Sequence, residues 1–199
     1  MEYNYEVAKN GTVNDFRLNL KEAKPIEKRV LNWLISNGVE CKPYSLKADK
    51  QGTDIACTWG TIDVKAEKQV FKTNNLTFET FSNILTSKLG WGWHDTDYII
   101  WVDDNPVTKN KYSQPRMYIA RLADLRQYYL RKKKNLRHVL NVPVRDRITK
   151  EIIQQSQIAL IPLMDFVKVY PLLWVLPGGS IVNIGKVELG KPYAKQKAN

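Results

Sequence analysis

The stretch Asp54–Lys65, with the sequence DIACTWGTIDVK, contains two short runs of strand-forming residues on either side of Trp59-Gly60. A two-residue loop that contains glycine is typical of a β-hairpin. We therefore predict a hairpin that turns at Trp59-Gly60. Directly opposed residues of a hairpin point to the same side of the sheet, and side chains alternate along each strand. This turn pairs Thr58 with Thr61, Ala56 with Asp63, and Asp54 with Lys65.

The predicted hairpin has one charged face and one apolar face. Asp54, Asp63 and Lys65 share the charged face, and Asp63 lies diagonal to Asp54 at about 7–8 Å. Two carboxylates at this separation can reach one Mg²⁺ or Mn²⁺, because Mg²⁺ binds a few carboxylates and keeps several waters. Lys65 is placed to orient an attacking water or to stabilise charge on a phosphate oxygen, which predicts metal-assisted hydrolysis of a phosphodiester. The apolar face, suited to a core, carries Ile55, Cys57, Ile62 and Val64.

The whole chain is strongly basic. Its 199 residues carry a formal net charge of +11, and 43% of them are hydrophobic, which indicates a globular protein, most simply one domain. The surplus of positive charge favours a polyanionic partner, and nucleic acid before a membrane surface. The alternative is a basic but otherwise ordinary protein. We expect a single domain over residues 1–184 and a basic tail over residues 185–199.

The sequence predicts neither secretion nor membrane insertion. Residues Met1–Lys9 are acidic and polar, and the most apolar segment, Ile158–Leu176, is interrupted by prolines and charges. Cys41 and Cys57 make neither a metal-site spacing nor a disulfide framework, and Cys57 is expected in the core. We therefore expect no membrane association and a reducing, cytoplasmic location, which is the host cytoplasm if the protein is viral.

The charged residues of the hairpin, Asp54 and Asp63-Val64-Lys65, resemble the motif of the PD-(D/E)XK nuclease superfamily. Thr53, not proline, precedes the first aspartate, and a second match at Glu22-Ala-Lys24 lies in a polar stretch with no strand to hold it. The resemblance covers about residues 24–125. It implies an α/β, restriction-endonuclease-like fold with a mixed central sheet flanked by helices, and cleavage of DNA with Mg²⁺ or Mn²⁺. Such compact nucleases are typical of phages and mobile elements.

The resemblance also implies roles for individual residues. Asp54, Asp63, the carbonyl of Val64 and Glu79 are expected to hold the metal, and Lys65 to orient the water. A strand expected at Leu76–Phe81 carries Glu79, and Ser82 follows as in the Glu-x-x-Ser feature of the family. Glu79 then has an accessory role and Ser82 a weaker one, as a nucleic-acid contact. Alternatively, Glu79 is a half-exposed strand residue.

A helix is expected at Pro25–Gly38, since proline suits a first helical position and glycine a helix end. A glutamate on the first helix of the resembled family often points at the metal, so Glu27 is the catalytic candidate there. The alternative is a solvated first-turn glutamate that the helix dipole favours. Both interpretations of Glu27 stay open.

Two further features suit nucleic acid. Trp91 and Trp93 lie in a glycine-rich loop, where they either stack on bases or cover the end of the core. A run of cations follows the helix expected at Leu122–Lys134, and it favours contact with the phosphate backbone, although cations also suit a helix C-terminus. The residues of this run are Arg131, Lys132, Lys133, Lys134 and Arg137.

The remaining segments extend the expected fold beyond the resemblance. We predict strands at Asp97–Val102, Arg116–Ala120, Gln157–Leu163 and Val167–Val175, and a short helix at Ile148–Ser156. Residues 126–184 then add C-terminal elements to a nuclease-like core.

Two other functions compete with a DNA endonuclease. One is a non-catalytic nucleic-acid-binding module on a nuclease-like fold, and the other is an interaction protein with a coincidental motif. The sequence contains no zinc cluster, phosphate-binding glycine loop or nucleophile elbow. A homodimer is expected if both strands of a duplex are cut.

Overall fold

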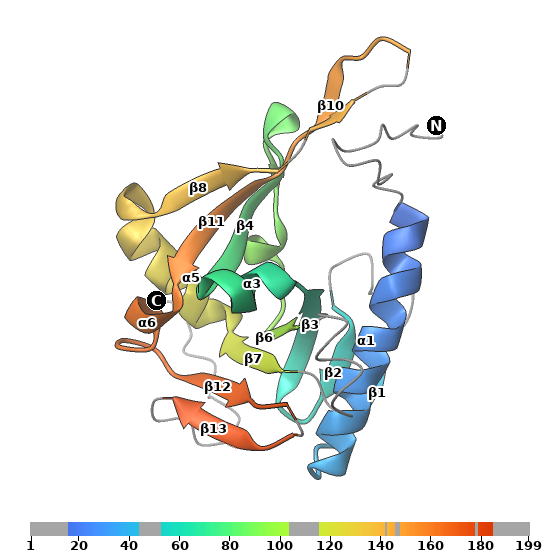
Figure 1. The fold of residues 1–199 in the computed structure, drawn as a ribbon, viewed down its shortest axis with the longest axis vertical. Helices are drawn as coiled ribbons and strands as arrows, with labels where there is room; N and C mark the ends of the chain where they lie inside the picture. Colours follow the sequence, from blue (N-terminus) through green and yellow to red (C-terminus); the bar gives the residue numbers. More distant parts are fainter. Residues whose placement is uncertain are drawn as a thin grey trace.

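Two β-sheets organise the part of the chain that the computed structural model describes, which is residues 16–43, 53–103, 116–141, 143–145, 148–177 and 179–184. One sheet has seven strands, the second has four, and two further strands form a separate hairpin (Figure 1). With few helices around them, the sheets make a mixed α/β fold, as predicted. The predicted tail at residues 185–199 lies outside the described residues.

The seven-stranded sheet contains the strand pair predicted from the sequence. Its strands β3 and β6 run parallel, and its other neighbouring strands run antiparallel. The strand predicted at Asp97–Val102 is β6, which lies in the middle of the sheet with four of its five residues buried. In spatial order the strands are β1 (Cys41–Pro43), β2 (Ile55–Cys57), β3 (Gly60–Ala66), β6 (Tyr98–Val102), β7 (Met117–Arg121), β12 (Leu172–Val175) and β13 (Ile181–Ile184).

The second sheet joins the two halves of the chain, because β11 pairs with β4. Its strands, in spatial order, are β5 (Lys88–Leu89), β4 (Asn75–Asn83), β11 (Gln157–Pro162) and β8 (Arg137–Leu140). The separate hairpin consists of β9 (Val144–Arg145) and β10 (Ile152–Gln154). The helix predicted at Ile148–Ser156 is therefore wrong, since its β-branched residues pair in a strand.

The described helices are few and mostly short. They are α1 (Phe16–Ser36), α3 (Lys68–Thr73), α5 (Leu122–Lys132) and α6 (Leu163–Phe166), with 3-10 turns η1 (Ile84–Thr86), η2 (Trp91–Trp93) and η3 (Lys133–Asn135). Within the described ranges, none of the helices combines the length and the apolar character needed to cross a lipid bilayer.

Helix α1 begins at Phe16, nine residues before the predicted start at Pro25. The prediction failed because proline is favoured at a first helical position but is also found inside helices that tertiary contacts hold. Ile26, Val30 and Trp33 supply those contacts, each at most 2% exposed against the sheet. The end of the helix agrees with the prediction, because Gly38 follows it closely.

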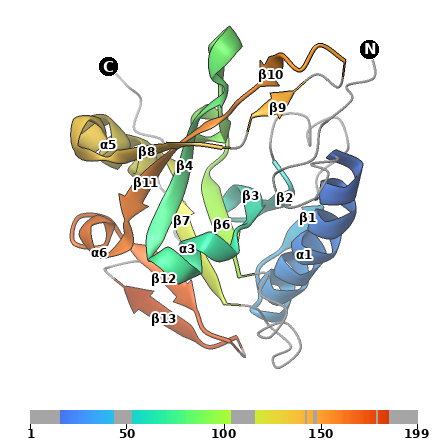
Figure 2. The ribbon, with the colours of Figure 1, turned by 45° about the horizontal axis from the view of Figure 1, so that its top comes forward.

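The seven-stranded sheet separates two hydrophobic cores, and Figure 2 shows α1 and α3 on opposite sides of β3. On β6, Ile100 belongs to the core beneath α1, whereas Ile99 and Trp101 belong to the core beneath the second sheet. On β3, Ile62 faces α1. Because side chains alternate, the adjacent Asp63 faces the second sheet. The charged face of the hairpin is thus turned toward the second sheet.

Candidate functional site

The hairpin of β2 and β3 forms as predicted, but its register is shifted by two residues. Cys57 pairs with Gly60, so the loop is Thr58-Trp59, one residue earlier than predicted. A shift of two keeps every side chain on its predicted face, because side chains alternate with a period of two. The paired residues end at Ile55 and Ile62. The amide of Asp54 donates to the carbonyl of Ile62 at 2.9 Å, so Asp54 lies just outside the strand pairing, with its carboxyl group near that of Asp63.

Gly60 and Asp97 together fix this register. Gly60 has a φ of +131°, and a Cβ at this position would overlap the Asp97 carboxylate. That carboxylate accepts hydrogen bonds from the amide of Thr61 at 2.8 Å and from its hydroxyl at 2.9 Å. Asp97 therefore has a structural role at the start of β3.

Asp63 and Lys65 form a close ion pair on β3, with Lys65 Nζ 2.9 Å from Asp63 Oδ1. The Asp63 side chain is 2% exposed and that of Lys65 is 24% exposed. Burial raises the pKa of Asp63 to about 7, with Asp54 raising it further and Lys65 opposing both. Burial lowers the pKa of Lys65, but attraction to Asp63, and then to Asp54 and Glu67, outweighs burial and raises it overall. Lys65 is thus protonated at neutral pH.

Asp54 completes what we call the acid–lysine site, which is Asp54, Asp63 and Lys65. The Oδ2 atom of Asp54 accepts a hydrogen bond from the amide of Val64 at 2.7 Å. The Oδ2 atom of Asp63 is buried and has no N–H or hydroxyl donor among the described residues, and the Asp54 carboxyl group is a close polar neighbour of Asp63. A buried carboxylate oxygen without a donor is costly, and a hard cation is a suitable partner for it. Asp54 and Asp63 therefore fit one side of a divalent-cation site.

The described residues do not supply a third acidic ligand. Within the described ranges, no group of three or more His, Cys, Asp or Glu side chains is arranged to hold a metal ion. Glu79, predicted as a ligand, instead accepts a hydrogen bond from the amide of Trp91 at 3.1 Å. Gly90 allows this contact, because a Cβ there would overlap the Glu79 backbone. In this conformation Glu79 does not join Asp54 and Asp63 as a ligand.

Glu67 is a further carboxylate near Lys65. It follows the end of β3, and its Oε2 atom accepts a hydrogen bond from the Thr77 hydroxyl at 2.6 Å. The indole of Trp101 donates in turn to that hydroxyl at 2.9 Å. Burial raises the pKa of Glu67, while Thr77 and Lys65 lower it. A third carboxyl group, after those of Asp63 and Asp54, is thus held near Lys65.

The two tryptophans of the glycine-rich loop belong to the core. Trp91 is 6% exposed, so the prediction that it stacks on bases is wrong and the alternative holds. Its ring lies beneath Lys65 Nζ, 5.6 Å from it. Trp93 is half-buried, packs edge-on against Phe78 and donates its indole hydrogen to the Thr80 carbonyl at 3.0 Å.

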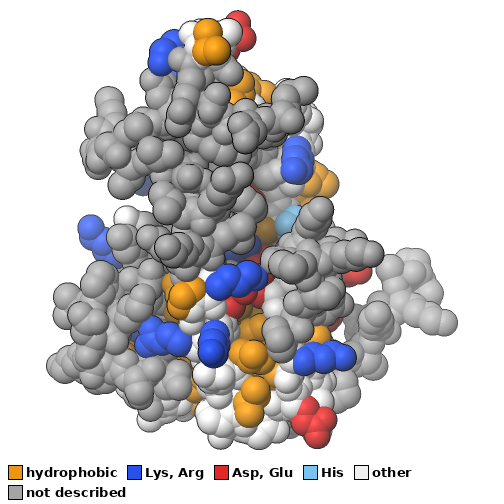
Figure 3. Space-filling model, turned by 90° about the vertical axis from the view of Figure 1, so that its right-hand side faces the viewer, with side chains coloured by type: hydrophobic (Ala, Val, Ile, Leu, Met, Phe, Trp, Pro, Cys, Tyr) orange, Lys and Arg blue, Asp and Glu red, His pale blue; other side chains and the backbone are white. Residues whose placement is uncertain are grey.

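Three basic side chains that the predictions did not include lie around this loop, and we call them the cationic rim: the cations Lys88 and Arg126, with His94 between them in the sequence. Arg126 donates to the backbone carbonyls of Gly92 at 2.7 Å and of His94. Burial lowers the pKa of His94, and the charges of Lys65, Arg126 and Lys88 lower it further. Figure 3 shows Lys and Arg side chains next to acidic side chains near the centre of one face of the molecule. In the sequence, His94 in the glycine-rich loop was the one member of this rim that could have drawn attention to it.

Ser82 and Glu27 have other described partners. The Ser82 hydroxyl donates to the carbonyl of Leu89 at 3.0 Å, which closes the turn between β4 and β5. Glu27 lies on α1, on the opposite side of β3 from Asp63, and Lys24 Nζ lies 2.7 Å from its carboxylate. The structure therefore brings Asp54, Asp63 and Lys65 together, and it gives Glu27 and Ser82 local contacts.

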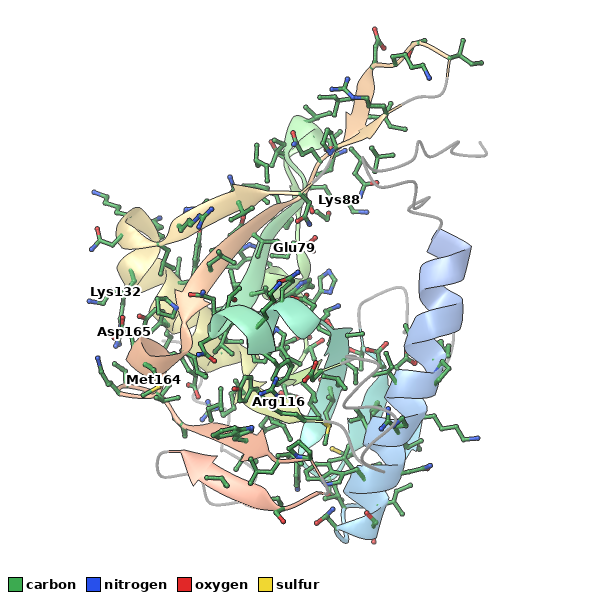
Figure 4. All side chains as sticks on the ribbon, in the orientation of Figure 1. Glu79, Lys88, Arg116, Lys132, Met164 and Asp165 are labelled. Atoms are coloured by element: carbon green, nitrogen blue, oxygen red, sulfur yellow. The ribbon has the colours of Figure 1, made fainter. Side chains whose placement is uncertain are left out.

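The predicted run of cations is exposed, and we call it the basic cluster. Figure 4 shows Lys132 on the α5 side of the molecule, away from Glu79 and Lys88. The cluster spans the last turn of α5, the turn η3 and the start of β8. All of its members are exposed, and they are Arg131, Lys132, Lys133, Lys134 and Arg137.

The chain was compared with known proteins at three levels. No protein-family model, no curated protein and no solved structure matches it.

Proposed function

We propose that this protein is a metal-dependent nuclease that hydrolyses phosphodiester bonds in DNA, on a restriction-endonuclease-like form of the mixed α/β fold. One observation carries the proposal. Asp63 keeps a buried carboxylate oxygen without an N–H or hydroxyl donor, near the Asp54 carboxyl group and beside a protonated lysine. Groups with strongly perturbed pKa values that converge in this way are typical of functional sites.

The two aspartates have the role of holding Mg²⁺ or Mn²⁺. When bound, the ion acts as a Lewis acid at the phosphate and lowers the pKa of its water. Its charge also offsets the repulsion between Asp54 and Asp63, which raises the pKa of Asp63 in the protein alone. Val64 supplies its amide to Asp54 and, in this proposal, its carbonyl to the ion. In this proposal neither Glu79 nor Glu27 holds the ion or contacts the reacting phosphate.

Lys65 acts as a donor rather than as a base, because its raised pKa keeps it protonated at neutral pH. Its Nζ atom can donate to an attacking water or to a phosphate oxygen on which charge develops. The ring of Trp91 beneath it and the ion pair with Asp63 limit its movement. Preorganised donors of this kind lower the cost of charge development in the transition state.

DNA is the proposed substrate because the chain has a net charge of +11 and presents cations both at the site and on the basic cluster. Cations that contact phosphates position a nucleic acid without reading its sequence. The cationic rim lies next to the acid–lysine site, so it is the part of the positive surface that a scissile strand would meet first.

The proposal is tested by cleavage of plasmid DNA with Mg²⁺ or Mn²⁺. We expect Lys65→Ala to lose about 100-fold or more of the cleavage rate, as removal of one transition-state donor does. Lys42→Ala removes an exposed lysine of β1 and serves as the matched control. EDTA is expected to stop the reaction. Equal cleavage by wild type and Lys65→Ala, from clean preparations, would reject this mechanism.

A non-catalytic nucleic-acid-binding module is the second candidate. It is favoured by the lack of a three-ligand group among the described residues and by a basic cluster that needs no carboxylates. This module predicts salt-sensitive DNA binding that Asp54→Ala leaves unchanged. Titration calorimetry separates the two candidates, because only the nuclease should bind Mg²⁺ or Mn²⁺ and lose that binding in Asp63→Asn.

A further inference from the structure

The two cysteines of the chain face each other across the strands β1 and β2. The antiparallel register pairs Cys41 directly with Cys57. The amide of Thr58 donates to the carbonyl of Glu40 at 3.0 Å, so the pair next to the cysteines is hydrogen-bonded. Because the two kinds of pair alternate, Cys41 and Cys57 form a non-hydrogen-bonded pair.

This kind of pair suits a disulfide. Its Cα atoms lie about 4.5 Å apart, and the Cα atoms of disulfides are usually about 4.4–6.8 Å apart. Pro43 falls at the next non-hydrogen-bonded position, which agrees with its lack of an N–H group. The Glu40–Thr58 hydrogen bond and the position of Pro43 therefore both support the pairing of Cys41 with Cys57.

The two sulfur atoms also share one side of the sheet. Cys41 and Cys57 both pack against the core beneath α1, and both are free and partly exposed. Burial, and then the charge and hydrogen bonding of Cys57, raise the pKa of Cys41 to about 12, which is a mark of close thiols. A small oxidant can reach side chains with this exposure.

We propose that Cys41 and Cys57 are a covalent modification site, at which hydrogen peroxide forms a disulfide between β1 and β2. The Cys57 thiolate attacks one peroxide oxygen, the O–O bond breaks, and a sulfenic acid and water form. The Cys41 sulfur then attacks the sulfenic sulfur, the S–O bond breaks, and a second water leaves with the proton of Cys41. The two thiols lose two electrons, and the peroxide gains them.

The disulfide would close the chain from Cys41 to Cys57 on the α1 side of the sheet. The acid–lysine site lies on the other face, so the cross-link leaves its residues in place. Closing a loop restricts the unfolded chain and stabilises the folded one. This inference does not depend on the proposed nuclease activity.

The test treats the full-length protein with about one equivalent of hydrogen peroxide and then alkylates it in denaturant. We expect a loss of two hydrogens (about 2 Da) in the intact mass, no alkyl groups, and a linked pair of tryptic peptides that contain Cys41 and Cys57. The melting temperature should rise by roughly 5–10 °C and return with dithiothreitol.

Cys41→Ser and Cys57→Ser are the controls, and neither should show the temperature shift or the loss of two hydrogens. Free dithiothreitol, oxidised in parallel, shows that the peroxide is active. Two alkylated cysteines after treatment, added oxygen in place of the lost hydrogens, or a disulfide between two molecules would each overturn the proposal.

Discussion

At the scale of single residues, Asp63 is a buried carboxylate that is poorly paired. Its side chain is 2% exposed, one of its oxygens has a partner in Lys65, and the other has no N–H or hydroxyl donor among the described residues. A fold selected only for stability would place an apolar residue there, because burial of a poorly paired charge is costly. A site that binds a cation explains why the carboxylate is present.

Asp63 should make stability depend on pH in a defined direction. Its pKa is about 7 in the folded protein and 3.8 in an exposed chain, so the folded state binds more protons between these pH values. The unfolding free energy therefore falls as the pH rises from about 4 to 7. The Asp63→Asn variant has no carboxyl group that titrates at this position. Between pH 5 and pH 8, the variant should gain on the order of 2–3 kcal/mol relative to wild type.

Urea unfolding of both proteins at pH 5 and pH 8 measures this difference. Asp95→Asn is a useful comparison, since Asp95 is an exposed aspartate outside the acid–lysine site. Parallel pH dependence in wild type and Asp63→Asn would show that Asp63 is ionised throughout this range, and the cation argument would lose its main support.

At the scale of secondary-structure elements, the hairpin of β2 and β3 depends on Gly60. Gly60→Ala should destabilise the protein by about 2–4 kcal/mol, because its φ of +131° and its contact with Asp97 both exclude a side chain. Gly38→Ala is the matched control. Gly38 also has a positive φ, of +78°, but a Cβ there meets nothing within 4 Å, so a loss of about 1 kcal/mol is expected.

Equal losses in the two glycine variants, measured by urea unfolding, would mean that Asp97 does not fix the register. The same pair of residues explains why the predicted register was off by two. Local turn preference placed the glycine second in the loop, whereas Asp97, 37 positions away along the chain, holds the strand start at Gly60 and Thr61. The side chains still lie on their predicted faces of the sheet, because a register shift of two residues does not exchange the two faces.

The glycine-rich loop shows a similar limit to what can be predicted from sequence alone. In the sequence, Trp91 and Trp93 look equally suited to nucleic acid and to the core. The structure packs the loop against β4, where Glu79 and Phe78 leave no room for a Cβ at Gly90 or Gly92. The tryptophans then fill the core because the glycines let the loop approach, and this packing is a tertiary effect.

At the scale of the whole molecule, the second half of the chain completes the first. Strand β11 pairs with β4, and β12 pairs with β7, so the residues after 125 cover two edges of the earlier strands. They also supply Ala159, Ile161 and Phe166 to the core beneath the second sheet. A fragment of residues 16–125 should therefore show no cooperative urea transition and no near-ultraviolet circular dichroism.

A cooperative transition in that fragment would instead make residues 126–184 an addition to an independent core. The full-length chain, unfolded under the same conditions, supplies the reference transition.

The distribution of charge gives a second prediction at this scale. Lys132→Ala/Lys133→Ala should weaken DNA binding and reduce the slope of log K against log salt by about 1–2, if both lysines contact phosphates. Lys28→Ala/Lys42→Ala removes the same charge from α1 and β1, which lie on the opposite side of the molecule from α5 (Figure 1). Equal slopes for the two double variants would assign binding to net charge alone.

The sequence by itself determined the alternation that puts Asp63 and Lys65 on one face of β3, because side-chain direction in a strand follows from local backbone geometry. It also determined the central strand β6 and the exposed basic cluster, which follow from apolar and charged runs. Only the tertiary structure decided the register at Gly60, the burial of Trp91, and the approach of Glu67 and His94 to Lys65. These features depend on contacts between residues distant in the chain, and no local pattern encodes them.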